Sequence, residues 1–154
     1  MSNVLLLLEP DIDTPNAVAY AIQRAVDIGG RLIAVAVLDP QTTQRVAATL
    51  ANVGFVGEKV NESVVETLTR EQNLQAEQVL KHIEEQVRKR GIAFVGMVKE
   101  GVPSDICAAI VREHDVTAAV LVVEKRSWLS RFLSRSAPLN LSGLGGCEIK
   151  IMED

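Results

Sequence analysis

The sequence predicts an α/β protein with a Rossmann-like, five-stranded, mainly parallel open sheet and helices on both faces. Two observations support this fold class. Apolar runs of strand length alternate with amphipathic stretches of helical length, and this alternation is typical of parallel sheets. The first run, residues 4–8, reads "VLLLL" and has no polar position, as expected for a strand buried on both faces.

The composition limits the number of domains and the classes of partner. The chain has 154 residues, of which 47% are hydrophobic, enough for one domain with a core over residues 1–154. The net charge of -4 gives no overall attraction for nucleic acid. No apolar run is long enough to span a bilayer, and the first one lacks the features of a signal peptide. We therefore expect a soluble cytoplasmic protein with no nucleic-acid partner and no stable membrane insertion.

The first predicted helix covers residues 14–28, where apolar side chains recur at helical spacing. A second apolar strand, "RLIAVAVLDP", follows in residues 31–40. The helix has a start signal in Asp13 or Thr14, either of which can cap it, and in Pro15, which suits the first turn. Gly29 and Gly30 end it.

The second half of the chain continues the alternation. Residues 41–60 predict only a partly helical connection, and a long helix is expected from Asn61 to Arg90, with a break near Asn73 as an alternative. A third strand is predicted in residues 92–101 and a helix that begins with Pro103 in residues 103–115. A fourth strand follows in residues 116–125 and a last strand in residues 147–152. The last strand, "CEIKIM", alternates apolar and polar residues, which indicates an edge strand.

Ligands of open parallel sheets bind beyond the carboxyl ends of the strands, where the strand order reverses. The loops at that edge are expected in residues 9–13, 38–41, 99–102 and from Glu124 onward.

The cysteines and histidines do not form a recognisable metal or disulfide motif. Cys107 and Cys147 are far apart in the sequence, and Cys107 in "ICAAIV" is most simply a small buried apolar residue. His82 and His114 have no ligand spacing between them, so we predict no metal site.

Residues 122–138, "VVEKRSWLSRFLSRSAP", form the one locally basic segment. On a helix, Trp128, Leu129, Phe132 and Leu133 would share one side, and Arg131 and Arg135 the other. The simplest interpretation is that the apolar side packs on the domain while the arginines are solvated. The alternative is a docking helix, because an aromatic residue beside arginines is typical of interaction hot spots.

Four pieces of the chain, taken in order, resemble the universal stress protein family. "LLLEPDIDTPNAVAYAI" resembles its first strand, loop and helix, and "AVAVLDP" its second strand. "VKEGVPSDICAAI" resembles its third strand and Gly-x-Pro turn, and "AAVLVVEKRS" its fourth strand and the start of its nucleotide loop. The resemblance covers nearly the whole chain and implies an ATP-binding fold.

The phosphate-binding pattern that this resemblance implies is not kept. ATP-binding members carry Gly-x2-Gly-x9-Gly-(Ser/Thr) after the fourth strand, and glycines there let backbone amides approach the phosphates. The same spacing falls on Glu124, Ser127, Ala137 and Pro138. Glu124 adds a negative charge, Ser127 and Ala137 add a Cβ, and Pro138 removes an amide donor.

The other loops also depart from the family pattern. Glu9 stands where the family has Asp, Pro10 where it has Gly, and Val102 where an acid is common. The main hypothesis is therefore a small stress-response or signalling module that does not bind ATP in the usual way, has no cofactor and is not an enzyme.

The sequence leaves a nucleotide-binding alternative, ATP with Mg²⁺ in a rebuilt loop, with slow hydrolysis not excluded. Lys125, Arg126 and Arg131 would then hold the phosphates, and the backbone near Leu38 and Val102 would contact the base. The candidate nucleotide site then consists of Glu9, Asp11, Leu38, Val102, Glu124, Lys125, Arg126, Ser127, Arg131 and Ala137.

Two further predictions concern partners. In an adaptor, residues 128–135 would dock on a protein or a membrane transporter through Trp128, Phe132 and Arg135. The resemblance also implies a homodimer through the last strand, Cys147 to Met152, whose unprotected edge invites pairing and where Glu148 and Lys150 would set the register.

Overall fold

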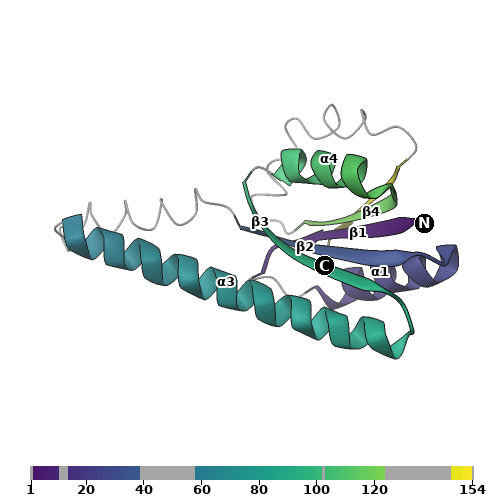
Figure 1. The fold of residues 1–154 in the computed structure, drawn as a ribbon, viewed down its shortest axis with the longest axis horizontal. Helices are drawn as coiled ribbons and strands as arrows, with labels where there is room; N and C mark the ends of the chain where they lie inside the picture. Colours follow the sequence, from purple (N-terminus) through teal and green to yellow (C-terminus); the bar gives the residue numbers. More distant parts are fainter. Residues whose placement is uncertain (1, 11–13, 39–57, 102, 124–146, 154) are drawn as a thin grey trace.

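The computed structural model describes residues 2–10, 14–38, 58–101, 103–123 and 147–153. In these ranges five strands form one sheet in the order β3-β2-β1-β4-β5, and every neighbouring pair is parallel (Figure 1). The predicted fold class is confirmed. The strands and helices, in chain order, are β1 Asn3–Leu8, α1 Pro15–Ile28, β2 Arg31–Leu38, α3 Glu58–Lys89, β3 Phe94–Glu100, α4 Pro103–His114, β4 Val116–Val123 and β5 Glu148–Glu153.

The strand order reverses at β1. The chain builds outward from β1 through β2 to β3, then returns to place β4 and β5 on the other side of β1. Leu6 is opposite Ala34 of β2 on one side and Val120 of β4 on the other. All residues of β1 are buried, as its continuous apolar run predicts.

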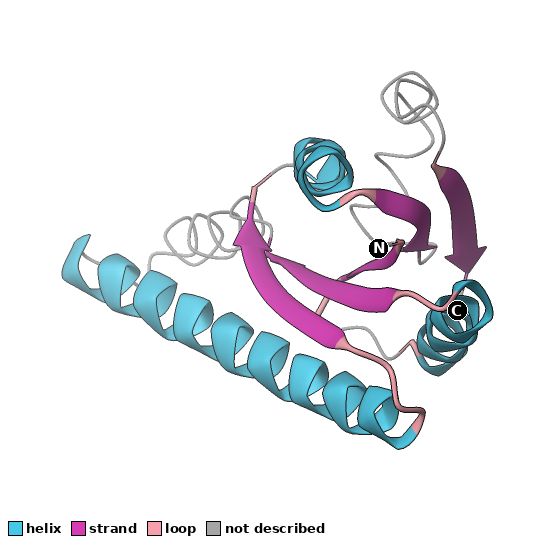
Figure 2. Ribbon diagram, turned by 45° about the vertical axis from the view of Figure 1, so that its right-hand side comes forward, coloured by secondary structure: helices cyan, strands magenta, loops and turns pink. Residues whose placement is uncertain are grey.

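The helices cover the two faces of the sheet separately (Figure 2). Val4, Leu6 and Leu8 belong to the core beneath α1 and α3, whereas Leu5 and Leu7 belong to the core beneath α4. This division follows from the two-residue periodicity of a strand.

Helix α1 begins and ends close to the predicted positions, but its predicted side-chain cap is absent. Thr14 is the N-cap residue, yet its side chain makes no capping hydrogen bond, and only its backbone oxygen accepts from Val18 N, at 3.0 Å. Asp13 lies outside the described residues. At the other end, Gly29 adopts the left-handed conformation, with φ of 64°.

Helix α3 is one helix of 32 residues, Glu58–Lys89, and passes Asn73 without the break that we considered. Asn73 Nδ2 donates a hydrogen bond to the Thr69 backbone oxygen at 2.8 Å. At 1.5 Å per residue the helix is roughly 48 Å long, about twice the length of the strands, so its first half extends past the sheet (Figure 1). From residue 66 onward, where the side chains of α3 are described, the buried ones are Ala76, Leu80, Ile83 and Val87.

Candidate functional site: the carboxyl edge of the sheet

Two of the predicted site residues lie in the described structure, and both are at the carboxyl edge of the sheet. Glu9 follows the last residue of β1 directly and is 6% exposed. Leu38 is the last residue of the neighbouring strand β2 and is also buried. A carboxylate therefore lies buried next to the point where the strand order reverses, as expected for the ligand end of such a sheet.

A backbone hydrogen bond joins the end of β2 to the turn after β3. Gly101 N donates to the Leu38 carbonyl oxygen at 3.2 Å. Gly101 has a φ of 143°, a conformation that L side chains rarely adopt, and Pro103 begins α4 two residues later. The expected meeting of the loops after the second and third strands is thus observed in the backbone, and the amino end of α4 lies beside it.

The rest of the predicted site lies outside the described residues. This applies to the other nucleotide-site positions and to the docking positions. The positions concerned are Asp11, Val102, Glu124, Lys125, Arg126, Ser127, Arg131 and Ala137 for the nucleotide site, and Trp128, Phe132 and Arg135 for docking.

Strand β5 is held at the edge of the sheet by contacts with α1 that the sequence did not reveal. Arg24 of α1 forms an ion pair with Glu148, and Lys150 Nζ lies 5.7 Å from the centre of the Tyr20 ring. Glu148 and Lys150 do share one face, as alternation requires, but this face is turned toward α1 within the same chain. No spacing in the sequence links Arg24 to a strand more than a hundred residues away.

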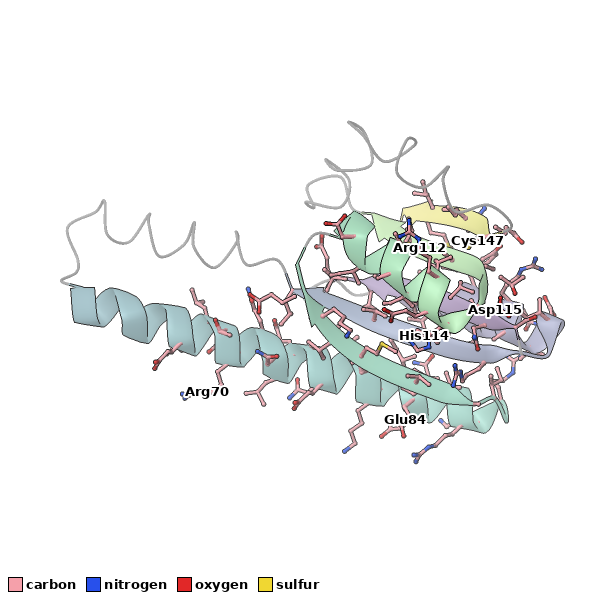
Figure 3. All side chains as sticks on the ribbon, turned by 45° about the horizontal axis from the view of Figure 1, so that its top comes forward. Arg70, Glu84, Arg112, His114, Asp115 and Cys147 are labelled. Atoms are coloured by element: carbon pink, nitrogen blue, oxygen red, sulfur yellow. The ribbon has the colours of Figure 1, made fainter. Side chains whose placement is uncertain are left out.

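The two cysteines meet on the opposite face. Cys107 of α4 is buried in the core beneath that helix, as predicted, and Cys147, just before β5, packs against the same core. Burial, followed by the nearby Cys147, raises the pKa of Cys107 to about 11. Burial and then the Glu148 carboxylate raise the pKa of Cys147. Figure 3 shows Cys147 next to β5, on the side of the sheet where α4 lies. Sequence reasoning treated each cysteine alone and missed that both belong to one core.

The two histidines each make one contact with an amide side chain. His82 Nε2 lies 2.9 Å from Gln86 Nε2, one helical turn away, and the His114 backbone oxygen accepts a hydrogen bond from Asn3 Nδ2. In the parts of the chain that the structure describes, no three His, Cys, Asp or Glu side chains gather as a metal site would require. None of the described helices is long and apolar enough to cross a membrane.

The all-parallel sheet, its reversal at β1 and the helices on both faces define an α/β protein of the Rossmann-like class. The model of the universal stress protein family matches residues 1–141. The chain belongs to the universal stress protein family.

Solved structures agree on the fold. A universal stress protein family member from Burkholderia pseudomallei is 18% identical, with a TM-score of 0.61, and the match covers 98% of this chain and 95% of that one. The Archaeoglobus fulgidus universal stress protein in complex with dAMP is 15% identical, with a TM-score of 0.58 and coverage of 98% and 97%. A universal stress protein in complex with cAMP is 16% identical, with a TM-score of 0.56 and coverage of 99% and 96%. No curated protein sequence matches the chain.

Proposed function

We propose that this universal stress protein is a non-catalytic binding module of the stress response that does not hold ATP in the usual manner of its family. The observation that carries the proposal is an altered glycine pattern in a chain whose described strands form the family's sheet, with a buried carboxylate at its carboxyl edge. Glu9, buried at 6% exposure, occupies the reversal point, and the four positions of the glycine pattern are Glu124, Ser127, Ala137 and Pro138.

Charge and backbone chemistry give the physical reason. Glu9 is one methylene longer than the Asp that the family resemblance implies, so its carboxylate reaches further from the end of β1. The family has a carboxylate at this position too, so the added charge is that of Glu124, which stands where the pattern has glycine. A triphosphate carries several negative charges, and a carboxylate in its loop disfavours it unless a cation compensates. Without the glycines and with a proline in the pattern, the loop also offers fewer amides to the phosphates.

The test is titration calorimetry of Mg²⁺-ATP into the purified chain, after removal of any nucleotide that is carried through purification. We expect no binding at millimolar ATP. A variant that restores the pattern, Glu124→Gly with Ser127→Gly, Ala137→Gly and Pro138→Ser, should gain binding. Micromolar binding by the unchanged protein would overturn the proposal, and thermal melting of both proteins shows whether each is folded.

The second candidate is a nucleotide-binding member with a rebuilt phosphate loop, and one described contact favours it. The Gly101–Leu38 hydrogen bond, at 3.2 Å, joins the two loops whose backbone would contact a base. Two structural relatives are complexes with cAMP and dAMP, which carry a single phosphate and therefore need fewer donors. If this candidate is right, AMP or cAMP binds the unchanged protein, and Arg126→Ala with Arg131→Ala abolishes that binding.

We also propose that the protein is a homodimer that pairs through β5. In the described sheet β5 is the outermost strand and pairs only with β4, so its other edge is available for another strand. Ile151 on this strand is 49% exposed. A second copy related by a two-fold axis would pair with the outer edge of β5 and cover the side chain of Ile151.

Sedimentation at micromolar concentration tests the dimer with a matched pair of variants. Ile151→Asp should give a monomer, whereas Leu74→Asp should leave the dimer intact, because Leu74 is equally exposed, at 51%, but lies on α3. A monomeric unchanged protein, or a dimer that only Leu74→Asp dissociates, would contradict pairing through β5.

A further inference from the structure

The two cysteines of this chain are 40 positions apart in the sequence but share one core. Cys107 lies in the middle of α4, and Cys147 immediately precedes β5, at the edge of the sheet that α4 covers. We propose that Cys107 and Cys147 are a thiol pair that a peroxide oxidises reversibly to an intramolecular disulfide, linking α4 to the edge strand.

The strand periodicity places Cys147 on the correct face. Glu148, Lys150 and Met152 are turned toward α1, so Cys147 and Ile149 are turned toward α4. Both of the latter pack against the core that contains Cys107. Both cysteines therefore belong to the layer between the sheet and α4.

The two thiols differ in solvent exposure in the way that a two-step oxidation requires. Cys107 is 1% exposed, so an oxidant in solution does not reach it directly. Cys147 is half-buried, and its Sγ lies 3.6 Å from the Glu148 backbone oxygen, close to the surface. Cys147 is therefore the thiol that meets the oxidant, and Cys107 is the thiol that resolves the product.

The electrostatics of the pair agree with this proximity. A charge on Cys147 is near enough to contribute to the raised pKa of Cys107. Because both pKa values are raised, thiolate is scarce at neutral pH, and oxidation should be slower than that of a free cysteine peptide. The pair would thus respond to sustained peroxide exposure and remain reduced under ordinary conditions.

The chemistry balances with one peroxide molecule. The Cys147 thiolate attacks the peroxide, its S–O bond forms as the O–O bond breaks, and the released hydroxide takes the thiol proton to become water. The Cys107 sulfur then attacks the Cys147 sulfenic acid, so that the S–S bond forms and the S–O bond breaks. The hydroxide leaves with the Cys107 proton as a second water. Two thiols lose two electrons in total, and peroxide is reduced to two waters.

The bond would close a covalent ring around one part of the chain. The ring contains the end of α4, all of β4 and residues 124–146, which include the basic segment and every position of the altered glycine pattern. Oxidation would therefore restrict the separation of α4 and β5 and fix both ends of that segment.

The experiment is peptide mapping of the purified full chain after exposure to hydrogen peroxide, with remaining thiols blocked by N-ethylmaleimide. Trypsin cuts after Lys99, Arg112, Arg135 and Lys150 and releases one cysteine peptide from each side, residues 100–112 and 136–150. We expect these two peptides to be joined, to separate on treatment with dithiothreitol, and to appear from monomeric protein on a non-reducing gel. The oxidised chain should also melt at a higher temperature than the reduced chain.

Two single variants distinguish the pair from independent oxidation. In Cys107→Ala, Cys147 should progress to sulfinic acid or join two chains, because its resolving partner is gone. In Cys147→Ser, Cys107 should stay reduced and react with maleimide only after unfolding. The proposal would be overturned if Cys147 gave the same oxidation products in Cys107→Ala as in the unchanged protein. It would also be overturned by the absence of joined peptides from the unchanged protein under a peroxide exposure long enough to oxidise Cys147 completely in the Cys107→Ala variant.

Discussion

The two glycines that end α1 should respond very differently to alanine, and their ranking is opposite to what the sequence suggests. Gly29 has the left-handed conformation, with φ of 64°, and is the expected sensitive position. A Cβ on Gly29 would nevertheless meet no atom within 4 Å. A Cβ on Gly30 would lie 2.2 Å from the Ser2 backbone oxygen, closer than real contacts allow.

The magnitudes follow from these two geometries. Gly29→Ala costs the left-handed strain alone, about 1 kcal/mol. Gly30→Ala forces Ser2 away and breaks the hydrogen bond from Arg31 N to the Ser2 oxygen, which is 3.1 Å long. That hydrogen bond contributes about 1 kcal/mol, and displacing packed backbone costs about 1–3 kcal/mol more. We expect Gly30→Ala to lower the free energy of unfolding by about 2–4 kcal/mol.

Urea denaturation of the unchanged protein and both variants measures these differences, and thermal melting gives a second reading. At about 2–4 °C per kcal/mol for a domain of this size, Gly29→Ala should lower Tm by roughly 2–4 °C and Gly30→Ala by roughly 4–16 °C. Equal losses for the two variants, or a larger loss for Gly29→Ala, would refute the reasoning. Such a result would mean that Ser2 swings aside at no cost and does not fix the start of β1.

Three further outcomes are expected. Ile83→Ala, at a 1% exposed position of α3, should lower the free energy of unfolding by about 2–5 kcal/mol in urea denaturation, whereas Leu74→Ala, at 51% exposure, should change it by less than about 0.5 kcal/mol. Arg24→Ala removes an ion pair whose partners are 33% and 50% exposed, so it should cost only about 0.2–1 kcal/mol, and less in high salt. Burial raises the pKa of Cys107 from its ordinary value of 9.0 to about 11 in the folded protein, so the stability that its neutral thiol preserves should be lost as pH rises through this interval. The loss is of the order of 2–3 kcal/mol in the free energy of unfolding. Urea denaturation of the unchanged protein and of Cys107→Ala at several pH values should show it as a difference between the two proteins. An equal decline of the free energy of unfolding in both would contradict it.

The elements that the sequence predicted correctly are those whose pattern is set by burial. Residues 4–8 and 32–38 are apolar throughout because both faces of β1 and β2 are covered, and this is visible without any tertiary information. The continuity of α3 through Asn73 does not follow from the sequence, because residues 66–75 are exposed or half-buried and show no apolar stripe. Thr14 has the right residue type for a cap, but its side chain makes no capping hydrogen bond.

The contacts that the sequence could not predict all join distant segments. The ion pair of Arg24 with Glu148 and the packing of Cys107 near Cys147 depend on the side of β4 where the last strand lies, and no local pattern encodes that choice. Once β5 is placed parallel to β4, alternation alone decides which face each residue takes. The position of Glu9 was predictable from the sequence, because a residue that directly follows a buried parallel strand lies at the carboxyl edge of the sheet.

The separation between core and ligand edge explains how the fold can persist while the phosphate loop changes. The side chains that hold the sheet together lie within the strands and on the inner faces of the helices, and Leu6, Ile33 and Val120 are each at most 1% exposed. Glu124, Ser127, Ala137 and Pro138 lie in the connection between β4 and β5 and belong to neither strand, so the backbone pairing of the described strands does not use their side chains. The same sheet can therefore form with either loop chemistry, and binding of Mg²⁺-ATP is a property of the loop that the titration measures separately from the fold.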